Sequence, residues 1–281
     1  MTFEFKHSII HPCGTEVHVV EDSIGPHGIR ATTLQLRYHR FVHAELLTHR
    51  ALSRNSSSSR AIPIHAFIEQ VSDDPALPIF VGRVDKGMKT VEEVADPLWV
   101  TERLAELGRH VAEKIGYIYA QSKAAKEILN RYLEPWQWMH TVITCTDWEW
   151  LFEPRLEVDE DGNPEAQREM YLLVSMIKEA LEKTTPRQLA YGEWHLPYVT
   201  PEDRKTRQIP NLLVISTARC CRVSYARHGQ VKGFSEDLRR HNDLVFKKHW
   251  SPTEHPLMCV SKTVRGGNVR GYLQYRQMVG G

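Results

Sequence analysis

Residues 48–60, THRALSRNSSSSR, constrain this chain more than any other stretch. They place basic residues on both sides of an asparagine and four consecutive serines. Arginine guanidinium groups bind phosphate oxygens in bidentate fashion, and serine hydroxyls and loop amides satisfy the remaining lone pairs. The composition therefore predicts a loop that binds a phosphorylated ligand. A flexible, solvated serine linker is the competing interpretation, and composition alone does not separate the two.

The spacing of these residues distinguishes the two interpretations better than their composition does. Six positions match the signature RHRxxSxNxxSxR of flavin-dependent thymidylate synthases, and the chain resembles that family through His49, Arg50, Ser53, Asn55, Ser58 and Arg60. A chance match over so many fixed positions would be rare, although a motif still needs its structural context. Three positions that the family uses for its nucleotide depart from the pattern, namely Thr48 for arginine, Glu45 for glutamine and Ser56 for an acidic residue.

Three further segments resemble motifs of the same family. Residues 126–135 resemble KExARxxLP with one extra residue, so Arg131 corresponds to a nucleotide-binding arginine and Asn130 competes for that place. Residues 148–155 resemble HFLxLR, whose final arginine meets the pyrimidine ring and corresponds to Arg155. Pro154 replaces the leucine of that motif. Residues 166–170, AQREM, match AQxEI.

The order of two other segments is unusual. Residues 217–225 resemble AARVSY, and residues 249–255 match HxSPxEH. In ordinary members these segments precede the signature, whereas here they follow it by well over a hundred residues. The order predicts a circular permutation, which is tolerated where the chain termini lie close together on the surface.

The resemblance implies a role for each matching residue. Arg155 and Ser58 are the predicted catalytic residues, Arg155 by stabilising charge on the pyrimidine and Ser58 by holding the phosphate with Arg60. The predicted substrate-binding residues are Asn55, Ser58, Ser59, Arg60, Arg131, Arg155, Gln274 and Arg276. Those expected to contact FAD are His49, Arg50, Ser224, His249, Ser251 and Glu254. We hypothesise that Gln274 and Arg276 supply the amide and guanidinium missing at Glu45 and Thr48.

The implied activity is methylation of dUMP to dTMP with methylenetetrahydrofolate, reduced FAD and NADPH, in a homotetramer whose flavin sites lie between subunits. A flavin-dependent pyrimidine nucleotide hydroxymethylase on the same fold is the first alternative. The second is a nucleic-acid-binding protein that uses the arginines of residues 30–60 as a basic face. A net charge of +1 and the lack of aromatic residues in the serine segment argue against it.

The resemblance implies an α/β fold, a twisted sheet flanked by long helices, in a single domain. We divide it into a signature half (1–64), a helical part (99–183) and a permuted FAD-binding segment (212–281). Residue patterns predict strands at 16–20, 31–37 and 141–146, the last with a tight helix start as its alternative. Helices are predicted at 39–49, 99–133, 165–183 and 236–249. Residues 62–98 and 184–211 are predicted to be mainly irregular connections.

Composition and length set the remaining expectations. A chain of 281 residues without a long apolar run favours a cytoplasmic protein that does not interact with membranes. Its five cysteines form no CxxC pair, so we expect reduced, structural thiols rather than disulfides. No HExxH or comparable spacing occurs among fifteen histidines, and no metal site is predicted.

Overall fold

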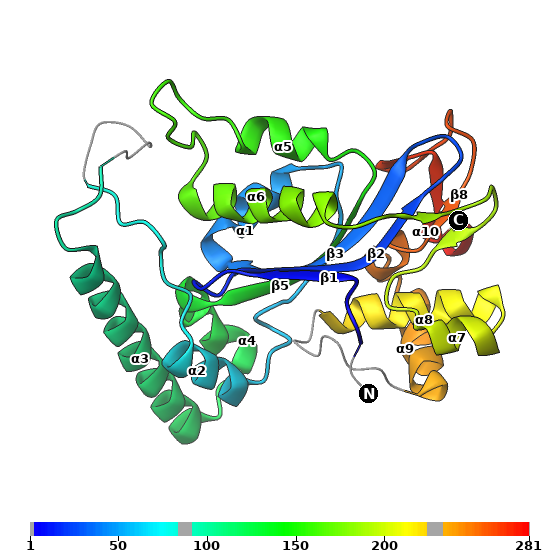
Figure 1. The fold of residues 1–281 in the computed structure, drawn as a ribbon. Helices are drawn as coiled ribbons and strands as arrows, with labels where there is room; N and C mark the ends of the chain where they lie inside the picture. Colours follow the sequence, from blue (N-terminus) through cyan, green and yellow to red (C-terminus); the bar gives the residue numbers. More distant parts are fainter. Residues whose placement is uncertain (1–2, 84–91, 224–232, 281) are drawn as a thin grey trace.

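An antiparallel sheet with helices on its flanks forms the centre of this computed structural model, which describes residues 3–83, 92–223 and 233–280 (Figure 1). In spatial order the strands are β1 (His7–Ile10), β2 (Glu16–Ile24), β3 (Arg30–His39), β5 (Trp138–Cys145) and β4 (Ser53–Ser56). A short strand, β6 (Arg187–Gln188), pairs in parallel with β2. The fold is thus mixed α and β, and the strands predicted at 16–20, 31–37 and 141–146 are confirmed, each longer than expected.

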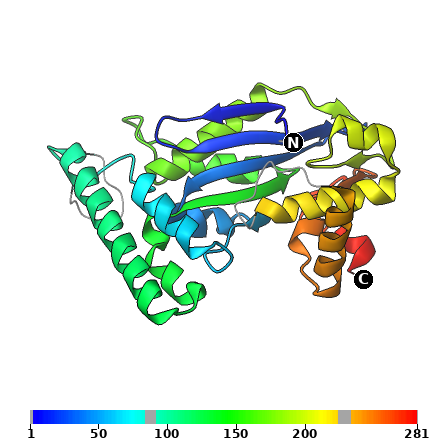
Figure 2. The ribbon, with the colours of Figure 1, turned by 90° about the horizontal axis from the view of Figure 1, so that it is seen from below.

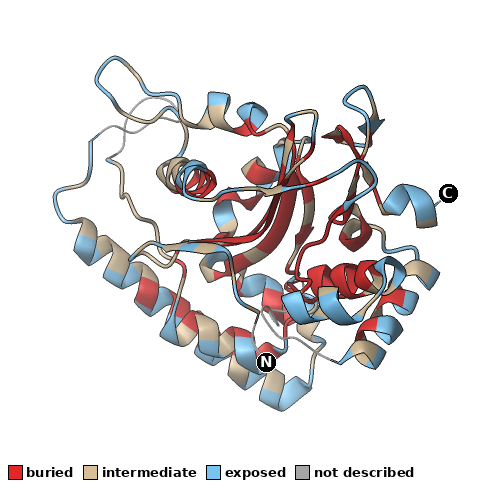
Figure 3. Ribbon diagram, turned by 45° about the vertical axis from the view of Figure 1, so that its right-hand side comes forward, coloured by how far each residue is buried: buried red, intermediate tan, exposed pale blue. Residues whose placement is uncertain are grey.

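One face of this sheet is apolar. Leu34, Leu36 and Ile143 are fully buried there in a cluster with residues of three helices (Figure 3). These are α1 (His43–Thr48), α5 (Glu149–Arg155) and α6 (Arg168–Glu182). The helix predicted at 165–183 is confirmed, and its apolar residues at helical spacing, Met170, Leu173, Ile177 and Leu181, are all buried. Burial of this face supplies the main hydrophobic core.

The opposite face of the sheet is polar although it is also buried. Direct cross-strand partners form a row in which Glu21 lies beside Thr33, Thr33 beside Thr144, and Thr144 beside Ser53. A small sheet of β7 (Trp194–His195), β8 (Leu257–Cys259) and β11 (Tyr272–Gln274) packs nearby, with α8 (Ile209–Arg222). Side chains must therefore provide hydrogen bonds that water would otherwise give.

Two histidines provide several of these bonds. Thr33 Oγ1 lies 2.8 Å from His195 Nε2 and 2.6 Å from Thr144 Oγ1, which in turn lies 2.8 Å from His255 Nδ1. The other ring nitrogen of His195 lies 3.0 Å from Ser23 Oγ. All five side chains are buried. The chain of bonds joins the small sheet to the two central strands of the main sheet.

The long helix predicted at 99–133 is shorter than expected. The helix predicted at 99–133 ends at Ser122 as α3 (Pro97–Ser122), because Lys123 adopts a left-handed φ of 51°. Three short helices follow, α4 (Lys126–Leu129), η2 (Asn130–Tyr132) and η3 (Glu134–Trp136). Gly108 and Gly116 both lie within α3. At Gly108 an added Cβ would come within 2.8 Å of the Trp136 ring, so glycine here allows close packing.

Two segments predicted to be irregular contain regular elements. Within residues 62–98 the structure has a ten-residue helix, α2 (Ile64–Asp73), whose buried Ile64, Phe67 and Val71 follow helical spacing. It packs against α3, and together they lie at the opposite end of the molecule from α8 and α9 (Phe234–Phe246) (Figures 1 and 2). Residues 184–211 contain β6, β7 and α7 (Pro201–Thr206).

The serine-rich segment is not entirely a loop either. Its middle is β4, an edge strand in register with β5. The sequence did not indicate this because a run of serine and asparagine lacks the β-branched residues typical of strands. In the structure Ser53 and Asn55 are buried on the polar face, where hydrogen bonds satisfy them.

The described part of the chain has no helix that is both long and apolar enough to span a membrane. The circular permutation and the division into segments stay predictions.

The two buried histidines make stability depend on pH. Burial lowers the pKa of His195 and of His255 to about 3, whereas an unfolded histidine has a pKa of about 6.5. Between these values the unfolded chain binds more protons, so the free energy of unfolding falls as pH decreases below about 6.5. The expected loss at pH 5 is on the order of 2 kcal/mol for each histidine.

We expect His195→Gln, whose amide can still bond to Thr33, to reduce this acid sensitivity by about that amount. Urea unfolding of both proteins at pH 7 and pH 5 measures the difference. An equal loss of stability in the two proteins would contradict the assignment.

Candidate functional site

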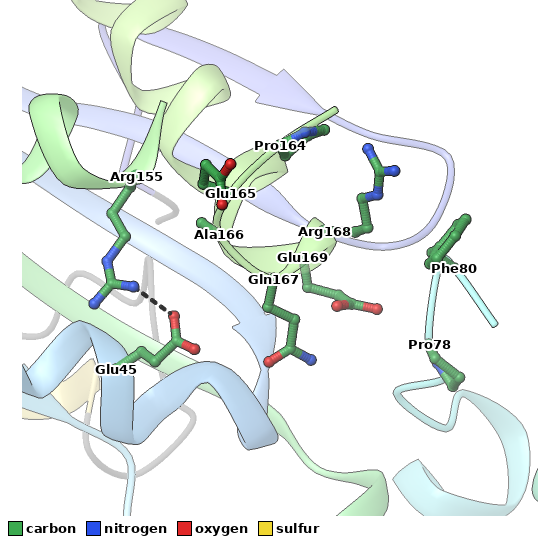
Figure 4. A pocket seen from close by; sticks show the side chains of 10 residues that line it. All are labelled: Glu45, Pro78, Phe80, Arg155, Pro164, Glu165, Ala166, Gln167, Arg168 and Glu169. Carbon is green, nitrogen blue, oxygen red and sulfur yellow. Dashed lines mark hydrogen bonds and ion pairs between the residues drawn. The ribbon is translucent and has the colours of Figure 1, made fainter. Parts of the chain in front are cut away.

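Arg155, the last residue of α5, bridges to α1. Its Nη1 donates to Glu45 Oε2 over 3.1 Å, and its Nε donates to His49 Nε2 over 3.0 Å. Figure 4 shows Arg155 and Glu45 facing each other at one end of a pocket. The arginine predicted to meet a pyrimidine therefore lies beside the start of the signature segment, 106 residues away in sequence from His49.

This cavity, here named the Arg155 pocket, has a volume of about 490 Å³. Residues 164–169, which include the first four residues of the AQREM segment, form one wall, and Phe80 lies at the far end (Figure 4). The Arg168 guanidinium stacks over the Phe80 ring at 4.8 Å, and Glu169 accepts a hydrogen bond from the Ile79 amide. Local contacts thus hold residues 168–169 and 79–80 together at the far wall of the pocket. At the near end, Arg155 and Glu45 present polar groups to the cavity.

The bond from Arg155 determines the protonation state of His49. Because a guanidinium can only donate, His49 Nε2 must be an acceptor without a proton. Its proton is then on Nδ1, which donates to the Trp150 carbonyl over 3.2 Å. Burial and the adjacent Arg155 charge lower the pKa of His49, which agrees with this neutral form. His49 is therefore a fixed neutral imidazole between α1 and α5.

A second cavity, here named the Arg50 pocket, lies on the other side of His49 and has a volume of about 500 Å³. Three arginines and one carboxylate line it, namely Arg50, Arg265, Arg270 and Asp147. Trp150 also lines it and is 66% exposed. An excess of cations next to an exposed indole suits a ligand that is both anionic and aromatic.

A tight hairpin brings two of these arginines to the pocket. Strands β9 (Arg265–Gly266) and β10 (Val269–Arg270) are joined by the two-residue turn Gly267-Asn268. Gly267 has a φ of +71°, which other residues rarely adopt. Asn268 Nδ2 donates to the Ala51 carbonyl over 2.8 Å, so the hairpin is attached to the signature segment.

Sequence reasoning did not assign Arg265, Asn268 or Arg270 to the site. The available signal was Gly-Asn, a typical two-residue hairpin turn, between two arginines.

Gln274 and Arg276 have partners other than those hypothesised. Gln274 Nε2 donates to Ser53 Oγ over 2.9 Å and to Asn268 Oδ1 over 2.8 Å, and Arg276 forms an ion pair with Glu254. Glu45 pairs with Arg155 instead. The idea that Gln274 and Arg276 replace the missing nucleotide contacts stays a prediction.

The serine end of the signature lies against η2 and η3. Ser59 Oγ donates to Glu134 over 2.5 Å, and the buried Asn130 amide donates to the Ser59 and Ile62 carbonyls. Asn130 therefore supports the backbone of this turn. Ser58, Arg60 and Arg131, predicted to bind phosphate, are exposed on the same part of the surface.

The predicted flavin contacts are distributed over several places. Ser251, in η5 (Ser251–Glu254), donates to Asn55 Oδ1 over 3.2 Å, and Asn55 donates in turn to the Cys220 carbonyl. His249 is exposed just after α9. Ser224 lies outside the described residues. The structure thus brings His49 to Arg155 and Ser251 to Asn55, while Ser58 and Arg60 lie beyond the other end of β4.

No protein-family model matches the chain, and no curated protein matches it significantly. Among solved structures, it is similar to the UMP/dUMP methylase PolB from Streptomyces cacaoi, bound with 5-Br UMP, at 17% identity over 59% of this chain and 88% of that chain, with a TM-score of 0.46. It is also similar to Thymidylate Synthase X from Helicobacter pylori with FAD and dUMP, at 15% identity over 54% and 67%, with a TM-score of 0.35. Scores this low do not show a shared function.

Replacing Arg155 by glutamine removes both the cation and the donor next to His49. We therefore expect Arg155→Gln to raise the pKa of His49 toward its ordinary value, as measured by NMR of the imidazole Cε1–H group. Arg168→Gln changes a cation on the far wall of the same pocket and should leave this pKa unchanged. An unchanged pKa in Arg155→Gln, or the same rise in both variants, would contradict the geometry.

Proposed function

We propose that this chain is a flavin-dependent enzyme that modifies a pyrimidine nucleotide, and that it methylates dUMP to dTMP with methylenetetrahydrofolate and NADPH. The observation that carries the proposal is the position of three motif segments around Arg155. Residues 48–60, 148–155 and 166–170 resemble motifs of one family and border two adjacent pockets. Such convergence is the structural context that a motif match requires.

The charges and shapes of the pockets support a nucleotide. Arg50, Arg265 and Arg270 exceed the single carboxylate of Asp147, which favours a dianionic phosphate or a pyrophosphate. The Nε of Arg270 is buried and has no hydrogen-bond partner among the described residues, so it can donate to a ligand. Trp150 offers an exposed aromatic face for a base or a flavin ring.

Arg155 would contribute to the chemistry by stabilising negative charge on the pyrimidine carbonyls. Its ion pair with Glu45 and its bond to His49 fix its orientation before a ligand binds. His49, Arg50, Ser251 and Glu254 would hold FAD, which when reduced supplies the electrons for forming the methyl group. Cys13, Cys145 and the other cysteines have no nucleophilic role in this proposal.

A homotetramer would explain why the phosphate-binding candidates are divided. Ser58 and Arg60 follow β4, whereas His49 and Arg50 precede it, and a four-residue strand spans roughly 13 Å. A site between subunits could combine Ser58 and Arg60 of one copy with Arg155 of another. The proposed enzyme therefore places its active site at a subunit interface.

The departure at Glu45 supports a second candidate, a related enzyme with a different base or product. A carboxylate only accepts hydrogen bonds, whereas the family's glutamine also donates. A cytosine amino group suits that acceptor better than a uracil carbonyl does. This candidate would be favoured if the flavin absorption band of the parent protein shifted with dCMP. The band of the Glu45→Gln variant should then shift with dUMP instead. The mass of the product distinguishes methylation from hydroxymethylation.

The nucleic-acid alternative loses support because several arginines of its basic face are already engaged within the fold. Arg30 pairs with Asp22, and Arg37 pairs with Glu16 and Asp74. The Arg54 guanidinium donates to the Leu47 and His49 carbonyls at the end of α1. These cations stabilise the fold and do not form a continuous binding surface.

The test is an absorption spectrum of the purified protein with FAD, followed by titration with dUMP. We expect a bound-flavin band that shifts on addition of dUMP, because nucleotide and flavin share adjacent pockets. Arg155→Gln should retain the flavin band and weaken the dUMP response about tenfold or more, since it removes a charged hydrogen-bond donor. Lys178→Gln on the exposed face of α6 is the matched control and should behave like the parent protein.

A protein that binds no flavin would overturn the proposal. A flavin band that ignores every pyrimidine nucleotide would do the same.

A further inference from the structure

A third charged cavity lies near the edge of the main sheet formed by β1, β2 and β6. It has a volume of about 790 Å³ and shares no lining residue with the Arg155 or Arg50 pocket. Residues 3–6, the start of β6 and the segment around α7 contribute to it. We name it the Glu21 pocket, after the carboxylate at its base.

Glu21 is nearly inaccessible, with 4% of its surface exposed, yet three cations surround it. Lys6 Nζ lies 3.2 Å and Arg204 Nη2 2.8 Å from its oxygens, and Arg187 Nε lies 3.8 Å away. Within the lining of the pocket one buried carboxylate therefore faces three positive charges, whereas Asp203, which also acts on Arg204, is paired with Arg219 outside it. The other two carboxylates of the pocket, Glu4 and Glu202, are exposed at its rim, where water screens them.

The arginines are held in place by the backbone. Arg187 Nη2 donates to the Trp194 carbonyl over 2.9 Å, and Arg204 Nη2 also reaches the Leu196 carbonyl at 3.4 Å. Arg187 Nε is buried and has no hydrogen-bond partner within the described residues. Two partly buried cations thus lack a full counter-charge, an arrangement that a bound anion would stabilise.

The other side of the cavity is apolar and aromatic. The rings of Phe3 and Phe5 lie 5.6 Å apart in an edge-to-face arrangement, and Val20 and Val199 complete this side. Stacking of Phe5 on His18, with ring centroids 4.4 Å apart, holds the aromatic side against β2. A ligand that fills the cavity would therefore place a flat apolar group here and its charge near Arg187 and Arg204.

We propose that the Glu21 pocket binds a small organic phosphate that carries a flat apolar group. Arginine forks match the geometry of phosphate oxygens, and the cavity is large enough for a molecule of nucleotide size. The site is separate from the proposed flavin and substrate pockets. It does not depend on their function.

Phenyl phosphate is the probe, and isothermal titration of the full-length chain is the measurement. The titrations use the Arg155→Gln protein, so that the Arg155 pocket does not contribute, and the Arg204→Gln comparison distinguishes binding in the Glu21 pocket from binding in the Arg50 pocket. We expect phenyl phosphate to bind at least about tenfold more tightly than inorganic phosphate, because it also fills the aromatic side. Adding Arg204→Gln should weaken its binding about tenfold or more, because a charged donor is lost.

Glu21→Gln provides the decisive second variant. Removing the internal carboxylate leaves three cations without their shared partner, so phenyl phosphate should bind more tightly than in the parent. Lys178→Gln, a charge change outside the pocket, should have no effect, and circular dichroism of each variant verifies folding. The proposal is overturned if phenyl phosphate does not bind, if it binds no better than inorganic phosphate, if Arg204→Gln has no effect or if Glu21→Gln weakens binding.

Discussion

The molecule depends on the hydrogen bonds that join two sheets across a buried polar face. Two neutral histidines, His195 in β7 of the small sheet and His255 directly after η5, reach Thr33 and Thr144 of the main sheet. Without these partners the buried hydroxyls would lose their hydrogen bonds to water and gain no replacement. The packing of the small sheet on the main sheet also places β11 and the β9–β10 hairpin next to the edge strand β4, where Gln274 donates a hydrogen bond to Ser53. The Arg50 pocket therefore exists only while the two sheets remain joined.

A second interaction organises the proposed site. Arg155 joins α5 to α1 through Glu45 and His49; Arg155 and Glu45 line one pocket, and His49 lines the other. Because residue 45 is a glutamate, part of the charge of Arg155 is already neutralised before a ligand arrives. A nucleotide would have to displace Glu45 from Arg155, or bind next to the intact ion pair. The identity of residue 45 thus links the fold of this region to the choice of pyrimidine.

The sequence predicts local features of this fold better than long-range ones. The strands around Val17 and Leu34 and the α6 stripe follow patterns that reflect their own burial. The end of α3 at Ser122 was missed because the lysine that follows gives no signal for a left-handed conformation. β4 was missed because its serines are satisfied by partners remote in sequence, such as Gln274, 221 residues from Ser53. For the same reason, motif spacing found His49 and Arg155 but not the arginines of the hairpin.

The most direct test of a nucleotide site built around Arg155 is a crystal structure of the chain soaked with FAD and 5-bromo-dUMP, in which anomalous scattering locates the bromine atom. The account predicts a bromine peak at the Arg155 pocket, with the pyrimidine carbonyls within hydrogen-bonding distance of the Arg155 guanidinium. A peak in the Glu21 pocket alone, or a pyrimidine remote from Arg155, would contradict it.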